Sequence, residues 1–488
     1  MEGGRGMGVF FKPDIGVAGD FIPFCHDGKY HLFYLRDWRD PSRYGEGTPW
    51  WHVVTSDFVR FEDWGESLPR GGSEDQDAWV FTGSVFRHRN RFHIFYTGHN
   101  PRMREKSRPI EVVMHATSGD LRTWKKDRGF MIEAPEALGY ERDDWRDPFV
   151  FRDSSRKRFC MLLAARKNAG PSRRRGCIAL AESRDLKKWK VLEPFFAPDQ
   201  YYTHECPDLA RIGEWRYLIF STFSDRFLTH YRMSRSLRGP WVAPWCDSFD
   251  GRAYYAAKTA GPAVGKGGEP AVRHIFGWLP TRAGEKDDGA WQWGGNLVVH
   301  QIWQDSDGAL MVRMPESIRG AFEADARPVK VRPVLGTWRQ REDVVTADAT
   351  GRFSAADLGE MPDDCLLEAC MNFRGSSSEW GMILRSDSSF ESCYQIRFEP
   401  ARQRMVFDRW PRPGDQAFVI ERPLRMEEGR SVTVRALVSG SCLVIYANDR
   451  VALSARMYDR KEGRLGLFVS NGFLAVQDMA IRLRRFRP

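Results

Sequence analysis

The stretch Tyr30-His31-Leu32-Phe33-Tyr34 decides the fold, because its pattern returns four more times along the chain. Each copy is a short apolar run with a more polar residue in second place, as in Phe92-His93-Ile94-Phe95-Tyr96, Phe159-Cys160-Met161-Leu162-Leu163, Trp215-Arg216-Tyr217-Leu218-Ile219 and Arg273-His274-Ile275-Phe276-Gly277. Counted between the second residues (31, 93, 160, 216 and 274), the copies are 62, 67, 56 and 58 residues apart. Self-similarity at such a period is the signature of a repeat architecture.

A second marker keeps phase with the first in four of the five repeats. It is a serine followed by leucine or phenylalanine and then an aromatic residue, at Ser56, Ser118, Ser183 and Ser234. Short strand-like runs lie between the markers, and helical periodicity is nearly absent. About four short strands per unit are typical of a propeller blade, so the sequence predicts a five-bladed β-propeller over residues 1–325. A β-sandwich or a helical solenoid with accidental periodicity is the alternative.

The repeat stops after Pro315-Glu316, and the chain changes character. Residues 326–340 begin with a stretch rich in charge and proline and are predicted to be a linker. Beyond them, alternation such as Val432, Val434, Ala436 and Val438 indicates strands with one buried face. Residues 341–488 are therefore predicted to form a β-sandwich, and the fold class is all-β: a five-bladed β-propeller followed by a C-terminal β-sandwich.

Composition excludes several classes of protein. With 488 residues, of which 42% are hydrophobic and 28% charged, the chain can bury a large core. Its nine cysteines show no C-x-x-C spacing, which favours free thiols over a disulfide framework. The net charge is +9, but the basic clusters at 173–175 and 482–487 are short and nearly lack interleaved aromatic residues, so we expect no nucleic-acid partner.

Hydropathy and aromatic content complete this picture. No window approaches the roughly 18 apolar residues of a membrane helix, and residues 1–20 carry no signal-peptide pattern. We therefore expect no membrane partner and a cytoplasmic location, or a secreted one if an export signal has been trimmed. Aromatic residues make up 13% of the chain and occur in short runs, which suit pleated strands.

Three acidic residues fall at nearly the same phase of three repeats. Asp20 lies eleven residues before its repeat marker, Asp147 thirteen and Glu205 eleven. Because the innermost strand of each blade lines the central channel, side chains at this phase converge at one mouth. Carboxylates gathered there raise one another's pKa, as an acid catalyst requires. We predict these three as the catalytic residues, and paired carboxylates in a concave site are typical of glycoside hydrolysis.

Several tryptophans lie near these acids in the sequence. Trp51 and Trp79 are the candidates for apolar platforms beneath a sugar ring, and Phe81 lies close by. Packing between blades is the alternative role for each of them.

The motifs around these acids resemble those of glycoside hydrolase family 32, which contains β-fructofuranosidases, invertases, inulinases and levanases. They occur in the family's order: Asp20 before Gly28-Lys29-Tyr30-His31-Leu32-Phe33-Tyr34, then Phe81-Thr82-Gly83-Ser84, Trp145-Arg146-Asp147-Pro148 and Glu205-Cys206-Pro207-Asp208. The sandwich is similar to that family's C-terminal module, best in Gly463-Arg464-Leu465-Gly466-Leu467-Phe468.

The resemblance implies a retaining mechanism and a role for each matched residue. Asp20 would be the nucleophile, Glu205 the general acid and then base, and Asp147 a non-covalent stabiliser that holds sugar hydroxyls. Arg146 would orient these carboxylates through its rigid fork of donors, and residues from Phe81 to Ser84 would shape the sugar pocket. The expected partner is an oligosaccharide or glycoside substrate with terminal β-fructofuranosyl units.

Two positions depart from the family pattern. The first motif usually reads Asn-Asp-Pro-Asn-Gly, whereas this chain has Gly19-Asp20-Phe21, and the Gln that commonly follows the first Phe-Tyr is Leu35. Both changes remove polar groups near the expected sugar pocket, so sucrose and inulin are doubtful substrates.

Three alternatives remain open at this point: an arabinofuranoside-type furanosidase on the same scaffold, a fructosyltransferase, and a non-catalytic carbohydrate-binding protein. The eleven histidines form no H-E-x-x-H or similar metal-ligand spacing, and the Gly-rich stretches lack the Lys-Ser/Thr of a phosphate loop. We therefore expect no cofactor and no metal.

Overall fold

Strands make up nearly all of the regular structure. The computed structural model describes residues 5–224, 226–262, 272–323, 325–375, 377–411 and 419–485. The chain divides into two compact units, the first of Met1–Ser248, Ala253–Pro280 and Trp293–Leu310, and the second of Phe249–Arg252, Thr281–Gln292 and Met311–Pro488. The first is a five-bladed β-propeller and the second a β-sandwich, as predicted.

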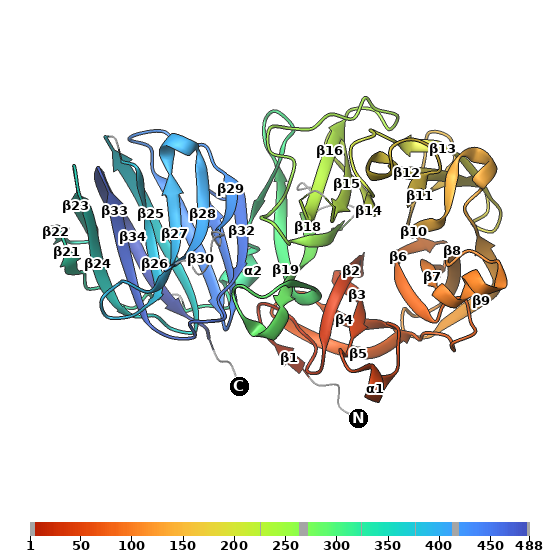
Figure 1. The fold of residues 1–488 in the computed structure, drawn as a ribbon, viewed down its shortest axis with the longest axis horizontal. Helices are drawn as coiled ribbons and strands as arrows, with labels where there is room; N and C mark the ends of the chain where they lie inside the picture. The colour runs from red at the N-terminus through yellow and green to blue at the C-terminus, as the bar shows by residue number, and fades with distance from the viewer. Residues whose placement is uncertain are drawn as a thin grey trace. The chain divides into compact units, whose positions relative to one another are not determined.

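The five blades follow one another around a ring in chain order, from red to green in Figure 1. The first blade contains β2 (Val17–His26), β3 (Lys29–Asp37), β4 (Trp50–Thr55) and β5 (Arg60–Leu68), with β1 (Arg5–Met7) paired to β5. The second contains β6 (Trp79–His88), β7 (Arg91–His99), β8 (Glu111–Ser118) and β9 (Trp124–Ile132). The third contains β10 (Tyr140–Asp153), β11 (Arg158–Lys167), β12 (Gly176–Ser183) and β13 (Trp189–Phe196).

The last two blades have three main strands each. The fourth contains β14 (Glu205–Ile212), β15 (Trp215–Thr222) and β16 (Leu228–Ser234), and the fifth contains β17 (Tyr255–Ala260), β18 (Arg273–Arg282) and β19 (Trp291–Gln304). The ring closes where β19 meets β2, through the pair Gly295 and Ala18 and through the Leu297 amide, which donates to the Phe11 carbonyl at 2.8 Å. Radial closure of this kind protects strand edges.

Both sequence markers correspond to recurring structure. The five apolar copies lie in the second strands β3, β7, β11, β15 and β18. The serine marker forms a turn: Ser118 Oγ accepts the amide of Leu121 at 2.9 Å, and Leu121 takes a left-handed conformation (φ 64) that buries its side chain. The turn at Ser183 and Leu186 is the same. In the first blade Thr55 plays this part for Phe58, rather than Ser56.

Aromatic side chains fill the spaces between blades. One cluster contains Phe33, Trp50 and Tyr96 from the first two blades, and the next contains Phe95 and Trp145 from the second and third. Because Trp50 and Trp145 are fully buried, packing between sheets accounts for them.

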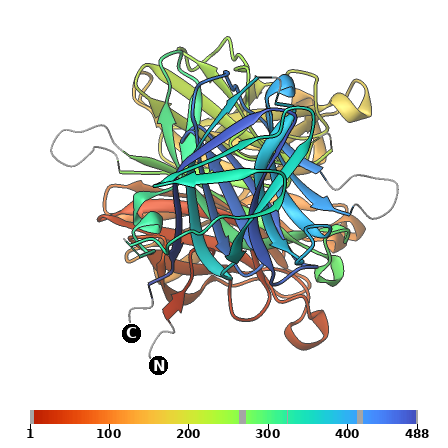
Figure 2. The same ribbon diagram turned by 90° about the vertical axis from the view of Figure 1, so that its left-hand side faces the viewer.

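Two seven-stranded antiparallel sheets form the second unit, whose strands run from cyan to blue in Figure 2. One sheet has the order β21 (Arg332–Leu335), β24 (Phe353–Glu360), β33 (Arg464–Ser470), β26 (Glu379–Ser386), β27 (Cys393–Glu399), β28 (Arg404–Trp410) and β29 (Val419–Pro423). The other has the order β22 (Trp338–Arg341), β23 (Val344–Asp348), β34 (Phe473–Leu483), β25 (Asp364–Arg374), β30 (Val432–Ser439), β31 (Cys442–Ala447) and β32 (Val451–Arg456). Buried side chains such as Leu367, Ile396 and Val434 form one core of this unit.

The stretch 326–340, expected to be a linker, differs in the structure. It contains β21 and most of β22, each at the edge of one of the two sheets. Edge strands tolerate proline and carry charge to resist further pairing, so their composition is the same as that of a linker. The inclusion of 249–252 and 281–292 in the second unit is likewise not visible in the sequence, because those segments lie inside the repeat region.

The remaining elements are short. They are β20 (Leu310–Arg313), α1 (Pro41–Tyr44), α2 (Glu316–Arg319) and 3₁₀ turns at Pro101–Lys106, Glu136–Leu138, Ser172–Arg174, Ala283–Glu285 and Pro400–Arg402. Within the described ranges, no helix is long and apolar enough to cross a membrane. All nine cysteines lie within the described residues, none of them forms a disulfide, as predicted, and six of them are buried.

The packing of the third blade gives a testable prediction. Leu163 on β11 is fully buried in the cluster between the second and third blades, so Leu163→Ala should lower the free energy of unfolding by about 2–5 kcal/mol through lost burial and a cavity. Leu138→Ala is the matched control, because that side chain is 42% exposed and its loss should cost less than about 0.5 kcal/mol. Urea denaturation of both variants measures the difference, and equal costs would contradict the packing.

Candidate active site

The first strand of every blade is interrupted at the same level. Pairing with the second strand shifts register between Gly19 and Ile22, Phe81 and Gly83, Arg146 and Phe149, Glu205 and Asp208, and Tyr255 and Lys258. Such β-bulges bend a strand and redirect its side chains. Four of the five bulges contain a residue in the left-handed region, at Asp20 (φ 47), Asp147 (φ 59), Cys206 (φ 51) and Ala256 (φ 49).

The five bulges arrange the site in two levels. One level consists of the last paired residue before each bulge: Gly19, Phe81, Arg146, Glu205 and Tyr255. The other level consists of the residue that follows each of these in the chain: Asp20, Thr82, Asp147, Cys206 and Ala256. Asp20 and Asp147 thus lie at the bulge level, whereas Glu205 lies at the level of Arg146. All three predicted acids line one pocket of about 590 Å³ in the first unit.

Asp20 on β2 is held by two donors from other blades. Thr82 Oγ1 on β6 donates to its Oδ2 at 2.7 Å, and Trp278 Nε1 on β18 donates to its Oδ1 at 3.2 Å. Burial raises the pKa of Asp20 to about 7, and the negative charges of Asp147 and Glu205 add to this rise, while the two hydrogen bonds oppose it. Asp20 therefore gains and loses its proton near neutral pH.

The other two acids are also destabilised as anions by burial. Burial raises the pKa of Asp147, against the nearby charge of Arg146 and the amide of Cys206, which donates to Asp147 Oδ2 at 2.8 Å. Burial likewise raises the pKa of Glu205, with Asp147 adding to the rise and Arg146 opposing it. Glu205 Oε2 also accepts the Tyr255 hydroxyl at 2.6 Å.

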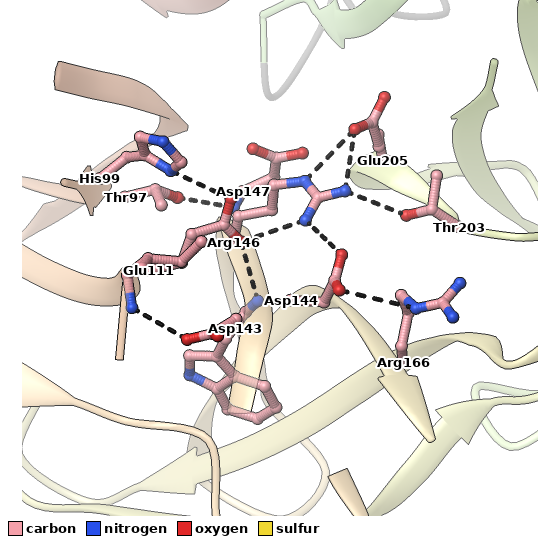
Figure 3. Close-up of polar contacts among 12 residues, drawn as sticks. Thr97, His99, Glu111, Asp143, Asp144, Arg146, Asp147, Arg166, Thr203 and Glu205 are labelled. Carbon is pink, nitrogen blue, oxygen red and sulfur yellow. Dashed lines mark hydrogen bonds and ion pairs between the residues drawn. The ribbon is translucent and has the colours of Figure 1, made fainter. Parts of the chain in front are cut away.

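Arg146 connects the acids of three neighbouring blades, as Figure 3 shows. Its Nε and Nη2 lie 3.2 and 3.0 Å from Glu205 Oε1, and its Nη1 lies 3.1 Å from Glu111 Oε2 and 3.0 Å from Asp144 Oδ1. Glu111 on β8 also accepts the Trp145 amide at 3.0 Å and pairs with His99 at 3.3 Å. Burial alone would raise the pKa of Glu111, but Arg146 and His99 lower it below its ordinary value. Arg146 is thus held in place by three carboxyl groups, of which Glu111 is the one whose charged form is favoured.

The predicted sugar-binding residues divide into two groups. Trp79, Phe81 and Arg146 line the pocket. Trp51 and Ser84 are absent from its lining and have other partners. Trp51 Nε1 donates to Asp63 at 2.9 Å beneath the guanidinium of Arg36, and Ser84 Oγ accepts the Val150 amide at 3.0 Å between two blades. The structure therefore differs from the prediction for these two residues, because Trp51 lies on the third strand of its blade and Ser84 contacts the neighbouring blade.

The sequence prediction missed Tyr255, Trp278 and Glu111, whereas Thr82 lies in the segment from Phe81 to Ser84 that the family resemblance assigns to the sugar pocket. Thr82 lies eleven residues before His93, the same phase as Asp20, so the repeat marks its position although it carries no charge. Tyr255 has no such signal, because the long connection between β17 and β18 shifts the count in the fifth blade. Trp278 lies on β18 of the fifth blade and Glu111 on β8 of the second, and only the three-dimensional structure brings them to the site.

The comparisons with known proteins agree with this geometry. The N-terminal domain of the glycosyl hydrolases family 32 matches residues 20–313, and the C-terminal domain of that family matches residues 337–482. The chain belongs to glycoside hydrolase family 32. The family assignment made from the motifs is thus confirmed.

Individual family 32 proteins are distant from this chain. A levanbiose-producing levanase from Bacillus subtilis (strain 168) is 29% identical over 268 residues, which cover 51% of this chain and 45% of the levanase. A sucrose-6-phosphate hydrolase from Escherichia coli is 22% identical over 482 residues, covering 93% of this chain and 89% of the relative. The solved structure of a sucrose-6-phosphate hydrolase from Lactobacillus gasseri has a TM-score of 0.72 at 19% identity, covering 98% of this chain and 93% of the other. The matched region thus spans about half of the levanase, and the structural likeness supports the fold.

Gly19 replaces the asparagine of the family 32 motif for a steric reason. A Cβ atom at this position would lie 2.5 Å from the ring of Trp293, which also lines the pocket. Trp293 thus occupies the space that a side chain at position 19 needs. At the second departure, Leu35 lines the pocket directly and presents an apolar surface there.

The electrostatics of Asp20 yield a prediction for stability. Its pKa of about 7 in the folded protein exceeds the ordinary value of 3.8, so the folded state binds the proton more tightly and stability rises as the pH falls from 7 towards 4. Asp20→Asn should therefore stabilise the protein by about 0.5–2 kcal/mol at pH 8, and the gain should vanish near pH 4.

Asp27→Asn is the matched control for this measurement. Asp27 has the same left-handed backbone (φ 48) but a side chain that is 85% exposed. Its substitution should leave the free energy of unfolding nearly unchanged between pH 4 and 8. A gain from Asp20→Asn that does not depend on pH would contradict the raised pKa.

Proposed function

We propose that this protein is a retaining glycoside hydrolase that removes terminal β-fructofuranosyl units from uncharged oligosaccharides. The observation that carries the proposal is the convergence of Asp20, Asp147 and Glu205 in one pocket, each with a different set of partners. Asp20 accepts hydrogen bonds from uncharged donors, whereas Glu205 is held between Arg146 and Tyr255. Two carboxyl groups in different environments are what acid and nucleophile roles require.

In the first step, an Asp20 oxygen attacks the anomeric carbon and forms a covalent ester. The glycosidic C–O bond breaks, and Glu205 gives its proton to the departing oxygen. In the second step, water attacks the same carbon, Glu205 takes a proton from that water, and the bond to Asp20 breaks. Asp20 leaves as a carboxylate, so the enzyme returns to its starting state.

The coupling between the acids helps Glu205 to change roles. The charge of Glu205 raises the pKa of Asp20, and because repulsion between two charges is mutual, a charged Asp20 disfavours the carboxylate form of Glu205. Formation of the ester removes the charge of Asp20, so the pKa of Glu205 falls and its carboxylate form becomes available as a base. Arg146, which lies 3.0 Å from Glu205, favours that same form.

Asp147 is proposed to bind the sugar rather than react with it. Its Oδ2 is occupied by the Cys206 amide, and no described residue donates a hydrogen bond to its Oδ1. That oxygen can accept a sugar hydroxyl, and a hydrogen bond of this kind strengthens as charge develops in the transition state.

The charges of the pocket favour an uncharged substrate. Its described lining contains the carboxylates of Asp20, Asp37, Asp147 and Glu205, against the single cation Arg146, which three carboxylates already hold. A sugar phosphate would meet repulsion there. We therefore favour fructans or fructo-oligosaccharides over the phosphorylated sucrose named for some relatives.

A substrate screen tests the proposal. The purified protein is incubated with levan and inulin oligosaccharides, sucrose, sucrose 6-phosphate and arabinofuranosides, and NMR follows the first anomer released. Release of β-fructofuranose supports the proposal. Release of arabinose, an inverted product or no sugar at all would overturn it, and fructosyl transfer without hydrolysis would favour a transferase.

Substitution of the two reacting acids should give different patterns. Asp20→Ala should reduce kcat on the order of 10⁴-fold with every substrate, because the nucleophile is lost. Glu205→Ala should cost about 10²–10⁴-fold with a sugar leaving group, but much less with p-nitrophenyl β-fructofuranoside, whose leaving group needs no proton. Asp27→Ala is the control and should retain activity. An equal loss in Glu205→Ala with both substrates would contradict its role as acid.

The pKa of Asp20 sets the acidic limb of the pH profile. As the pH falls below about 7, Asp20 becomes protonated and kcat/KM should fall. Thr82→Val removes a donor that favours the charged form, so it should move this limb to higher pH. Thr117→Val, on strand β8 of the same blade, is the control and should not move it. An unshifted limb in Thr82→Val would assign the titration to another group.

A further inference from the structure

A second pocket lies on the outer face of one sheet of the sandwich. It has a volume of about 630 Å³ and lies over strands β24, β26, β27 and β28. Strand β27 alternates: Tyr394, Ile396 and Phe398 point into the core, whereas Gln395, Arg397 and Glu399 line the pocket. All lining residues belong to the second unit, so the pocket is separate from the site described above.

The floor of this pocket is a fixed set of charges. Arg397 Nε lies 2.8 Å from Glu399 and 3.2 Å from Glu379, and its Nη1 lies 2.9 Å from Asp408. Glu399 also pairs with Arg404 at 2.7 Å. Arg397 and Glu399 are less than a tenth exposed. These groups are therefore held in one geometry before any ligand arrives, which lowers the entropic cost of binding.

Aromatic rings stand around these charges. Phe353 is 41% exposed and Trp410 50% exposed, and in the described part of the second unit they are the only aromatic side chains that are more than a third exposed. Both line this pocket. The ring of Phe390 lies against Gly466, where a Cβ atom would come within 2.4 Å of it. Exposed aromatic rings beside fixed polar groups indicate a binding surface rather than a purely structural ion network.

The balance of charge identifies the class of ligand. The lining contains Glu379 and Glu399 against Arg397 and Arg402, so it favours neither an anion nor a cation. Sugars match such a surface, because their ring faces stack on aromatic side chains while their hydroxyls bond to charged donors and acceptors. The volume is in the range of ligand pockets and accommodates a few sugar rings.

We propose that this pocket is a second carbohydrate-binding site, which holds a segment of the polymeric fructan whose ends the propeller cleaves. The identity of the polymer rests on the proposed function. Trp410 and Phe353 would carry the stacking contacts, and the ion network would orient the hydroxyls. Such a site tethers the protein to its polymer and raises the local concentration of chain ends.

Affinity electrophoresis in gels containing levan or inulin tests the proposal. The full chain carries Asp20→Ala, so that the polymer is not consumed, and Trp410→Ala or Phe353→Ala is added to it. We expect retardation in at least one polymer, and each added substitution should weaken the apparent affinity at least fivefold. Trp245→Ala is the matched control, because this tryptophan is 61% exposed but lies in the first unit, outside both pockets.

The outcomes separate this proposal from the proposed function. Retardation that persists unchanged in Trp410→Ala and Phe353→Ala, or that falls equally in Trp245→Ala, would overturn the second site, as would no retardation at all. The unsubstituted protein is assayed in parallel on short fructosides. Hydrolysis there without Trp410-dependent retention leaves the proposed function intact, whereas loss of hydrolysis bears on the propeller alone. Thermal unfolding of each variant shows that it is folded.

Discussion

The ion network around Arg146 is the interaction on which the rest of the site depends. A pocket that gathers three carboxyl groups away from water is unstable unless some of the charge is compensated. One guanidinium contacts Glu205, Glu111 and Asp144, so it links three consecutive blades. Because Glu111 and Asp144 hold it on one side, its remaining donors face Glu205 in a fixed geometry. The position of the proposed acid–base residue thus depends in part on Glu111 and Asp144, which lie outside the lining of the pocket.

Arg146 compensates only part of the negative charge in the pocket, and the proposed chemistry uses the raised pKa values that result. The hydrogen-bond donors that contact Asp20 in the described structure, Thr82 and Trp278, are uncharged, so burial and the neighbouring charges leave its pKa near 7. Glu205 and Asp147 also keep raised pKa values despite Arg146. The propeller tolerates this cost because the acids lie in or beside bulges of three paired strands, β2, β10 and β14, whose hydrogen bonding holds them in place. Burial of these acids lowers the stability of the folded protein at the site where the proposed reaction needs their raised pKa values.

The pockets of the two units differ in their balance of acidic and basic side chains. In the propeller pocket, carboxylates outnumber cations and their mutual repulsion tunes proton transfer. In the pocket of the sandwich, acids and arginines are balanced, and exposed aromatic rings surround them. The first arrangement suits a reaction, and the second suits the recognition of a neutral ligand. The chain thus combines a pocket whose charges suit catalysis with a second pocket whose balanced charges and aromatic rings suit the binding of a neutral sugar.

The sequence by itself determined the architecture and the three acids. The repeat of Tyr30-His31-Leu32-Phe33-Tyr34 reports a local property, because each blade buries its own second strand, and the phase of Asp20, Asp147 and Glu205 follows from it. The composition of an edge strand such as β21 predicts a linker, because charged residues and proline are typical of linkers and of edge strands alike.

Only the tertiary structure decided which side chains surround the acids. Trp278 reaches Asp20 across 258 positions of the chain, and Tyr255 reaches Glu205 across 50. Neither pairing has a local signal: the first depends on closure of the ring between the fifth and first blades, and the second on packing of the fourth blade against the fifth. The tertiary structure likewise keeps Trp51 and Ser84 out of the pocket lining, because Trp51 lies on the third strand of its blade and Ser84 contacts the next blade.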